Sequence, residues 1–363
     1  MRILHILPNL TYNGGIESCV LNYYNKIEGD ISFDFIAHEN IDDKLVKQIN
    51  DKGGQVFSFP RFSILNLKKI YNEFSLILQA NKYDVIHCHA ANMSFFYLYI
   101  ANSYHVPVRV LHSHQSSYAD TLFHKIRNIP LIYCGKRFST HFAACSKKAG
   151  DFLFFPRKYT LVNNAIDTNK YEFNSSTRLM LRKFNDLDNY IVMGQIGRFN
   201  EQKNHLFSLK VLYLLKKRFP NRYKLCLFGD GPLKERIISE IKRLSLEEDV
   251  IFFGVKNNLY DYYNMLDLVV MPSLYEGLSV AAVECQANGL PLILSDRVAA
   301  ETKINDNVVL LPLIEKKWVD KIVSVEMPCR LNGLINIQKS GFDINLEAKN
   351  LILFYRNCLS NAK

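Results

Sequence analysis

Short apolar segments rich in β-branched and aromatic residues alternate, along this chain of 363 residues, with longer segments whose apolar residues recur every three or four positions. The first pattern is typical of buried strands and the second of amphipathic helices. In the first half of the chain the pattern predicts strands at 2–7, 32–38, 55–59, 84–89, 108–114, 139–146 and 159–167, and helices at 16–26, 42–52, 64–81, 92–104 and after Phe123. Such an alternation predicts a parallel sheet with helices on both faces.

The sequence turns polar between positions 171 and 188, and the alternation then starts again. The second series predicts strands at 190–197, 224–231, 250–254, 268–273 and 291–296, and helices at 204–219, 233–244, 259–265 and from about Val280. We therefore expect an α/β protein of two doubly wound, Rossmann-like domains, 1–168 and 169–345. A final helix within 346–363 could pack on either domain, and we expect it to pack back on the first.

Composition narrows the class of protein. The chain is 48% apolar with a mean hydropathy of −0.06, and no apolar run approaches the roughly 20 residues that span a bilayer. Pro8 interrupts the apolar N-terminus, which predicts a first strand rather than a signal peptide. The eight cysteines are scattered without a C-x-x-C pair, which argues against a zinc site or a disulfide framework and favours reduced thiols in a cytoplasm.

The net charge of +10 is concentrated in one zone. Nine basic residues lie between Arg109 and Lys158, and only Asp120 and Asp151 oppose them. A basic zone of this kind suits nucleic acid, an anionic membrane or a phosphorylated ligand. A solvated, solubilising surface is the alternative.

Two features of the first domain follow predicted strands. Asn13, Gly14 and Gly15 join a strand to a helix, where glycines let the backbone approach a ligand and the helix N-terminus favours an anion. A tight turn without a ligand is the alternative, and dinucleotide binding is disfavoured because no G-x-G-x-x-G is present. His112 and His114 follow another strand. No carboxylate or thiolate follows at ligand spacing, so we expect a hydrogen bond to a substrate hydroxyl, or a structural role, rather than a metal.

The second domain has three further candidates after strands. Arg198 and Lys203 open a helix and are suited to a diphosphate, since Arg offers a fork of donors and Lys a mobile charge. Two loops could approach a nucleotide through exposed backbone, although each has a plain turn as its alternative. Their candidate residues are Gly229 and Gly231 in one loop, and Gly254, Val255 and Lys256 in the other.

Two glutamates lie in an otherwise apolar stretch, SLYEGLSVAAVECQANGLP, that runs from Ser273 to Pro291. Glu276 is predicted on the loop after a buried strand, and Glu284 in the second turn of the following helix. Carboxylates accept hydrogen bonds from the vicinal hydroxyls of sugars and riboses. The amides of the helix start attract phosphate; they belong to Gly277, Leu278 and Ser279. Together with the cations, these groups describe a sugar–diphosphate–nucleoside ligand.

These motifs carry a family resemblance. The pairing of Arg198-x4-Lys203 with Glu276-x7-Glu284 resembles the retaining, GT-B-fold glycosyltransferases of family 4. The likeness extends over nearly the whole chain, through YDVIHCH, AACS, VNNAID and GDGP. The segments SLYEGL and GLPLILSD are similar to the EpsF-like branch, which works in capsular and exopolysaccharide assembly.

The resemblance implies a role for each matching residue. Arg198 and Lys203 would hold the leaving diphosphate, Glu284 the ribose and Glu276 the donor sugar. His112, or else His114, would be the active-site histidine. Gly14 and Gly15 would approach the diphosphate and acceptor. A metal or other cofactor is not expected, because family members of this type neutralise the leaving group with Arg, Lys and helix dipoles.

The function expected from this resemblance is transfer of a hexosyl-type sugar, with retention, from a UDP-sugar (GDP-sugar as the alternative) to a lipid-linked glycan of capsule, exopolysaccharide or O-antigen type. The alternatives are a GT-B-fold epimerase and a non-catalytic sugar-nucleotide binding protein; an oxidoreductase lacks its dinucleotide fingerprint. The basic and aromatic segment 122–138 predicts a membrane-facing surface, with a core helix as its alternative. We expect a cytoplasmic protein, peripheral on the inner face of the cell membrane, without a nucleic-acid partner.

Overall fold

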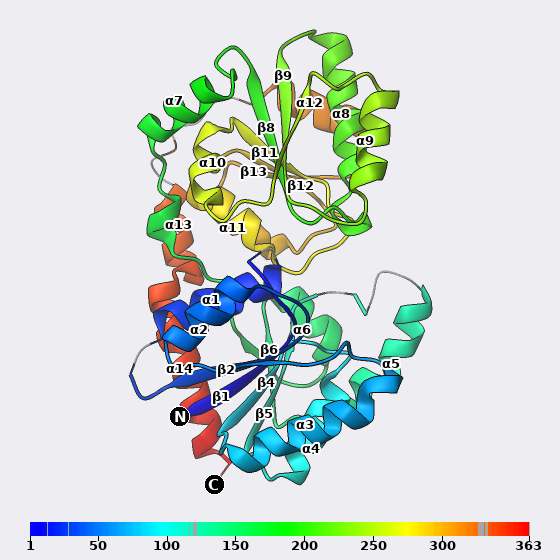
Figure 1. Ribbon diagram of the computed structural model, residues 1–363. Coiled ribbons are helices and arrows are strands. Elements are labelled where there is room, and N and C mark those ends of the chain that lie inside the picture. The colour runs from blue at the N-terminus through cyan, green and yellow to red at the C-terminus, as the bar shows by residue number, and fades with distance from the viewer. Residues whose placement is uncertain are drawn as a thin grey trace. The chain divides into compact units, whose positions relative to one another are not determined.

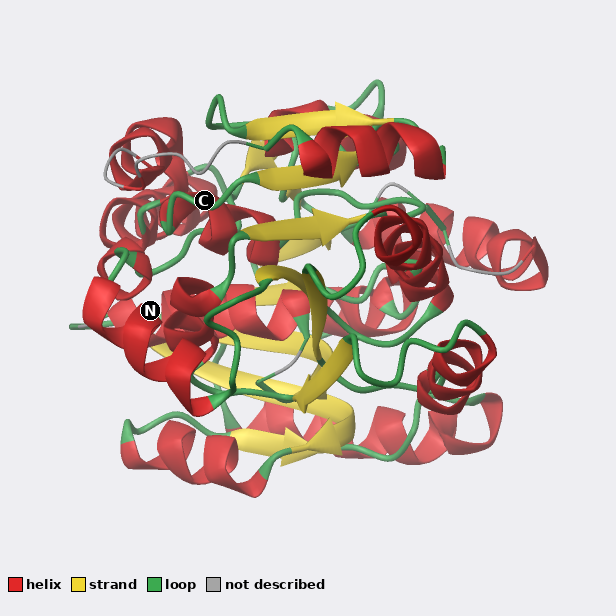
Figure 2. Ribbon diagram, turned by 90° about the horizontal axis from the view of Figure 1, so that it is seen from above, coloured by secondary structure: helices red, strands yellow, loops and turns green. Residues whose placement is uncertain are grey.

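The computed structural model describes residues 1–12, 14–27, 29–115, 117–118, 122–325, 330 and 333–362. The chain divides into two compact units, one of residues 1–164 with 344–363 and one of residues 165–343. Each unit contains one all-parallel sheet, with helices on both of its faces (Figures 1 and 2). The predicted fold class, two Rossmann-like α/β domains, is confirmed.

The first unit has a seven-stranded sheet in the order β3-β2-β1-β4-β5-β6-β7. Its strands are β1 (Arg2–Leu10), β2 (Ser32–Ile41), β3 (Val56–Ser58), β4 (Val85–Cys88), β5 (Val108–Ser113), β6 (His141–Ala144) and β7 (Thr160–Leu161). Its helices are α1 (Gly15–Lys26), α2 (Asp43–Asp51), α3 (Leu67–Ala80), α4 (Ser94–Ser103), α5 (Leu122–Phe138), α6 (Lys147–Phe154) and α14 (Ile344–Ser360). The strand predicted at 159–167 is much shorter in the structure, and α6 was not predicted.

The two faces of this first sheet differ in character. One face packs an apolar core against α3, α4 and α6, with Ile70, Tyr97 and Phe154 fully buried in it. The other face is covered by α1 and by the C-terminal helix α14, which lie on the same side of the sheet in Figure 1. Under these helices the sheet carries aromatic rings and histidines, and Tyr355 of α14 packs edge-on against Phe33 and His87.

The second unit has a six-stranded sheet in the order β10-β9-β8-β11-β12-β13. Its strands are β8 (Ile191–Ile196), β9 (Tyr223–Phe228), β10 (Val250–Gly254), β11 (Leu268–Met271), β12 (Leu292–Ser295) and β13 (Val308–Leu311). Its helices are α7 (Ser175–Phe184), α8 (His205–Arg218), α9 (Lys234–Arg243), α10 (Leu259–Met265), α11 (Val280–Ala287), α12 (Glu315–Val323) and α13 (Gly333–Ile337). One core packs α8, α9 and α12 on the sheet, and a second core packs α10 and α11 on the opposite face.

The strand order reverses between β1 and β4 in the first sheet and between β8 and β11 in the second. At such a switch point the connections leave the sheet in opposite directions, so a crevice opens beyond the carboxyl ends of the two strands. The loops after these four strands are therefore the places where each sheet is prepared to receive a ligand.

Candidate functional site

The loop after β8 places the two predicted cations at the switch point of the second sheet. Arg198 is exposed, and within the described part of the chain its guanidinium makes no hydrogen bond or ion pair. Lys203 is fixed through its backbone, because its N–H donates to the Asn200 side chain at 3.1 Å and its carbonyl accepts from Gln195 Nε2 at 2.8 Å. The loop thus holds one cation in place and leaves the other free to meet a ligand.

The loop after β11 brings Glu276 to Lys203. The ammonium of Lys203 donates to Glu276 Oε1, and only 17% and 6% of these two side chains are exposed. The hydroxyl of Ser273 donates to the same oxygen at 2.8 Å. The R-x4-K and E-x7-E motifs, 73 residues apart at this pair, therefore meet as a buried ion pair between two neighbouring strands.

Glu284 has different partners. It lies in the second turn of α11, where Tyr171 donates to its Oε1 at 2.6 Å and Tyr263 to its Oε2 at 2.8 Å. Burial raises the pKa of this carboxyl group, and the two tyrosine hydroxyls oppose that shift. Sequence reasoning missed both tyrosines, since a tyrosine in an α/β chain carries no sign of its partner. They fix the carboxylate while leaving lone pairs on its oxygens for further donors.

The first residues of α11 follow Glu276 directly. Gly277 and Leu278 are buried and Ser279 is half-buried. Ser279 is the N-cap residue, in an extended conformation, and its side chain makes no capping hydrogen bond. The first amides of a helix have no acceptor within it, so this end of α11 carries the partial positive charge that suits an anion.

The glycines after β9 support the loop that carries Arg198. A Cβ on Gly229 (φ +139°) would lie 2.2 Å from the Gly197 carbonyl oxygen, and one on Gly231 would lie 2.6 Å from that of Phe199. Both positions therefore exclude a side chain because the two loops pack backbone to backbone. This packing accounts for both glycines without invoking a nucleotide. Their contact with a nucleotide stays a prediction.

The loop after β10 is more open. A Cβ on Gly254 (φ +66°) would meet no atom within 4 Å, and Val255 is 41% exposed. The ammonium of Lys256 lies 5.1 Å from the centre of the Tyr262 ring. The positive φ of Gly254, rather than a lack of space, therefore favours glycine at this position, and the predicted contact of the loop with a nucleobase is untested.

The first unit carries the remaining predicted residues. Gly14 is the N-cap residue of α1 and Gly15 its first residue, whereas Asn13 lies outside the described residues. The carboxylate of Glu17 lies against Gly14, where a Cβ would come within 1.7 Å of Glu17 Oε2. A side chain at Gly14 would therefore require the flexible Glu17 carboxylate to move.

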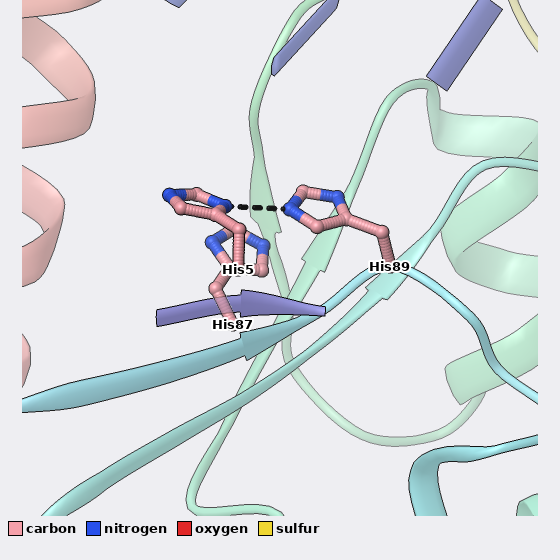
Figure 3. Close-up of side chains that lie close together, drawn as sticks. All are labelled: His5, His87 and His89. Atoms are coloured by element: carbon pink, nitrogen blue, oxygen red, sulfur yellow. Dashed lines mark hydrogen bonds between the residues drawn. The ribbon is translucent and has the colours of Figure 1, made fainter. Parts of the chain in front are cut away.

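His112 and His114 do not stand alone on their strand. His112 is 1% exposed and shares a hydrogen bond of 3.0 Å with His87, while the more exposed His114 shares one of 2.9 Å with His89. Burial lowers the pKa of His114 to about 3 and that of His112 well below its ordinary value, so both rings are neutral. Sequence reasoning missed His5, His87 and His89, which lie beside them; Figure 3 draws these three. The spacing in VIHCH, which repeats that in LHSH, was a signal for two of them.

Comparison with known sequences identifies the class of protein to which this fold belongs, with its strand-end ion pair and its free arginine. Residues 178–321 match the sequence profile of "Glycosyl transferases group 1". A putative glycosyltransferase of Bacillus subtilis, EpsF, is 33% identical over 309 residues, 82% of this chain and 79% of the relative. The chain belongs to this family, the GT4-type glycosyltransferases, and is similar to EpsF within it.

Two further relatives extend the likeness. The capsular polysaccharide biosynthesis glycosyltransferase CapH of Staphylococcus aureus is 24% identical, with 98% of both chains covered. A UDP-Gal:α-D-GlcNAc-diphosphoundecaprenol α-1,3-galactosyltransferase of Escherichia coli is 24% identical, over 76% of this chain and 73% of the relative. Family membership favours transfer over the epimerase and the binding-protein alternatives.

Among solved structures, Anabaena HepE in complex with UDP and glucose has a TM-score of 0.81 at 18% identity, with 98% of this chain and 99% of that one covered. At this identity the likeness concerns the fold, and it identifies the two parallel-sheet units as those of the GT-B fold. No described helix has both the length and the apolar character needed to cross a membrane.

Proposed function

We propose that this glycosyltransferase moves a sugar, with retention of configuration, from a UDP-sugar to a lipid-linked glycan in capsule or exopolysaccharide assembly. The observation that carries the proposal is the buried pair of Lys203 and Glu276 with the free guanidinium of Arg198, at the switch point between β8 and β11. It offers two cations and one carboxylate where a Rossmann-like sheet receives its ligand.

The chemical task in this proposal is to stabilise a departing diphosphate. Arg198 presents a planar fork of donors to the phosphate oxygens, and Lys203 supplies a second charge beside it. The first amides of α11 add partial positive charge. These groups are in place before the reaction, so they stabilise the developing charge at little reorganisation cost. In this proposal, that neutralisation needs no metal ion.

Each of the two carboxylates binds one of the two sugar rings of the donor in this proposal. Glu276 is the acceptor for hydroxyls of the transferred sugar, because it lies against the cation that holds the diphosphate. Glu284, oriented by Tyr171 and Tyr263, is the acceptor for the ribose hydroxyls. His112 and His114 are the candidates for contact with the donor sugar, and exposure favours His114.

Retention follows in this proposal if the acceptor hydroxyl attacks from the face that the diphosphate leaves. A leaving phosphate oxygen accepts the hydroxyl proton, and the sugar passes through an oxocarbenium-like state. The protein then contributes position and charge rather than a nucleophile. The activity of the Escherichia coli relative, an α-1,3-galactosyltransferase that uses UDP-Gal, supports this choice.

The names of the relatives support the proposed substrates. UDP is favoured over GDP because HepE, of the same fold, binds UDP with glucose, and because the Escherichia coli relative uses UDP-Gal. That relative acts on a diphosphoundecaprenol-linked sugar, which supports a lipid-linked acceptor. CapH supports a place in capsule assembly.

Helix α5 supports peripheral attachment to the inner face of an anionic membrane. Its inner side packs Asn128, Ile132 and Gly135 toward the unit, and a Cβ on Gly135 would lie 1.9 Å from Ser94 Oγ of α4. Its outer side exposes large apolar side chains, namely Phe123 (74%), Ile126 (64%), Ile129 (48%) and Tyr133 (72%). The exposed Arg127 and Arg137 share this helix. Apolar anchors beside basic residues suit an anionic lipid surface.

The direct test is release of nucleoside diphosphate. The full chain is incubated with UDP-glucose, UDP-galactose, UDP-N-acetylglucosamine or GDP-mannose, with and without a polyprenyl-diphosphate-linked sugar. Release of UDP that depends on the lipid acceptor, and that Arg198→Ala abolishes, supports the proposal. Interconversion of the free donor sugar would instead favour an epimerase, and binding without turnover a binding protein.

A further inference from the structure

Five histidines gather on one face of the first sheet, around its switch point. His5 lies on β1 directly opposite His87 of β4, and His89 follows that strand. His112 lies on β5 and His114 follows it. Because side chains alternate along a strand, residues two apart share a face, and each of the five rings contacts at least two of the others.

The hydrogen bonds of these rings form two chains. In one, His5 Nδ1 meets His89 Nε2, and His89 Nδ1 meets His114 Nε2, each at 2.9 Å. Figure 3 shows the first of these contacts as a dashed line. In the other, the hydroxyl of Tyr355 meets His87 Nδ1 at 2.5 Å, and His87 Nε2 meets His112 Nδ1 at 3.0 Å.

Two of the buried ring nitrogens remain without a partner among the described residues. His5 Nε2 and His112 Nε2 are buried and make no hydrogen bond among the described residues. A buried polar atom without a partner costs roughly 1–3 kcal/mol, so a purely structural cluster would leave an unexplained loss at each site. His112 calls for a ligand in particular, because it forms a group with His89 and His114 in which each residue offers one ring nitrogen and these nitrogens lie within 4.8 Å of one another.

We propose that His89, His112 and His114 bind one divalent transition-metal ion, with Zn²⁺ the best match to their chemistry. Each ring offers one nitrogen, and the three nitrogens lie within 4.8 Å of one another. A tetrahedral zinc with Zn–N bonds of about 2.0–2.1 Å needs its nitrogens about 3.3 Å apart. His89 Nδ1 and His114 Nε2, now 2.9 Å apart, need to separate only slightly.

The other nitrogens of two ligands already have partners. His89 Nε2 faces His5 Nδ1, and His112 Nδ1 faces His87 Nε2, which is itself linked to Tyr355. Metal-binding histidines commonly donate their second N–H to such a partner, which fixes the tautomer and the ring orientation. On binding, the proton of the His89–His114 hydrogen bond moves to the other nitrogen of its ring, so no other reactant is required.

A second triad, His5, His87 and His89, is also close enough for a metal but fits less well. Both nitrogens of His87 are engaged in hydrogen bonds, and all three residues are buried. The proposed triad includes the partly exposed His114, which gives an ion a route in and leaves the fourth position open to water. Sequence alone argued against a metal at His112 and His114, because their third partner, His89, follows a different strand, β4.

Binding is measured on the tag-free full chain stripped with EDTA, without nucleotide-sugar. Calorimetric titration with Zn²⁺ and the visible absorption of bound Co²⁺ report stoichiometry and coordination. The tested variants are His89→Gln and His114→Gln, and His105→Gln is a matched control because His105 is exposed. Thermal melting in EDTA establishes that each variant folds, and the partly exposed His114 keeps the test available if His89→Gln does not.

We expect one Zn²⁺ per chain, a four-coordinate Co²⁺ spectrum, and at least a tenfold loss of affinity in His89→Gln and His114→Gln but not in His105→Gln. Absence of stoichiometric binding would overturn the proposal, as would equal binding by all variants, which would mean surface binding only. The metal titration contains no nucleotide-sugar, and the release assay tests Arg198 of the other unit, so failure of metal binding can be told apart from failure of transfer.

Discussion

Replacing Lys203 with methionine separates the role of the ion pair in stability from its role in transfer. Lys203→Met keeps most of the side-chain volume and removes the charge, which leaves the Glu276 carboxylate buried with Ser273 but without its cation. Loss of one partner of a buried ion pair costs about 3–5 kcal/mol. We take the lower end, because the Ser273 hydroxyl remains.

A loss of about 3 kcal/mol lowers the melting temperature by about 6–12 °C in a unit of this size. The double variant Lys203→Met/Glu276→Gln removes both charges, so most of that loss should be recovered. Arg198→Met should shift the melting temperature by less than about 2 °C, because an exposed side chain without partners contributes little. The measurement is thermal unfolding followed by circular dichroism.

The transfer activities of these variants should not parallel their melting temperatures. All three variants lose a diphosphate cation, so kcat/KM for the UDP-sugar should fall by about 10²–10³ in each, a range taken from the removal of single transition-state donors. The double variant is decisive because it should be stable and inactive. A double variant as unstable as Lys203→Met would refute the ion-pair argument. Wild-type turnover in Arg198→Met or Lys203→Met would refute the diphosphate role.

Three further outcomes are expected. Ile126→Glu on α5 should reduce co-sedimentation with anionic vesicles at least tenfold, whereas Phe184→Glu, at a side chain 83% exposed in the other unit, should not; equal effects would contradict the membrane surface. Burial raises the pKa of the Glu284 carboxyl group above its ordinary value of 4.5. The protonated carboxyl group therefore makes its full contribution to stability below pH 4.5, and this contribution is lost as the pH rises through the pKa of the folded state. Glu284→Gln should therefore melt higher than wild type near pH 8 but not near pH 4, with a raised KM for the donor; a pH-independent difference would contradict this. Gly229→Ala should unfold more readily by about 1–3 kcal/mol, since its Cβ would meet the Gly197 carbonyl, and unchanged melting would contradict the loop packing.

The sequence predicted elements well where apolar periodicity was regular. The helix expected at 259–265 is found with those bounds as α10. The polar stretch 171–188 gave no such signal, yet it contains α7, which docks through arginines. Arg178 and Arg182 both reach the buried Asp267, and Arg182 also donates to backbone carbonyls. In a sequence, charged residues that are buried as ion pairs cannot be distinguished from charged residues on the surface.

The candidate site shows the same limit. The sequence placed Lys203 and Glu276 after strands of the same domain, but their ion pair depends on β8 and β11 being neighbours in the sheet, which the alternation of elements does not give. Tyr171 and Tyr263 could not be predicted, since their hydroxyls reach Glu284 only through the packing of α10, α11 and the segment before α7. The link between H-x-H on β4 and H-x-H on β5 depends on strand register, which the spacing of residues does not give.

The central claim is transfer with retention from a UDP-sugar, and the configuration of the product tests it most directly. The full chain is supplied with the α-linked UDP-sugar that gives acceptor-dependent UDP release, and the anomeric coupling of the glycan product is measured by proton NMR. The account predicts an α-linked product, formed one for one with UDP and absent with Arg198→Ala. A β-linked product would contradict retention, and a sugar altered without UDP release would contradict transfer itself.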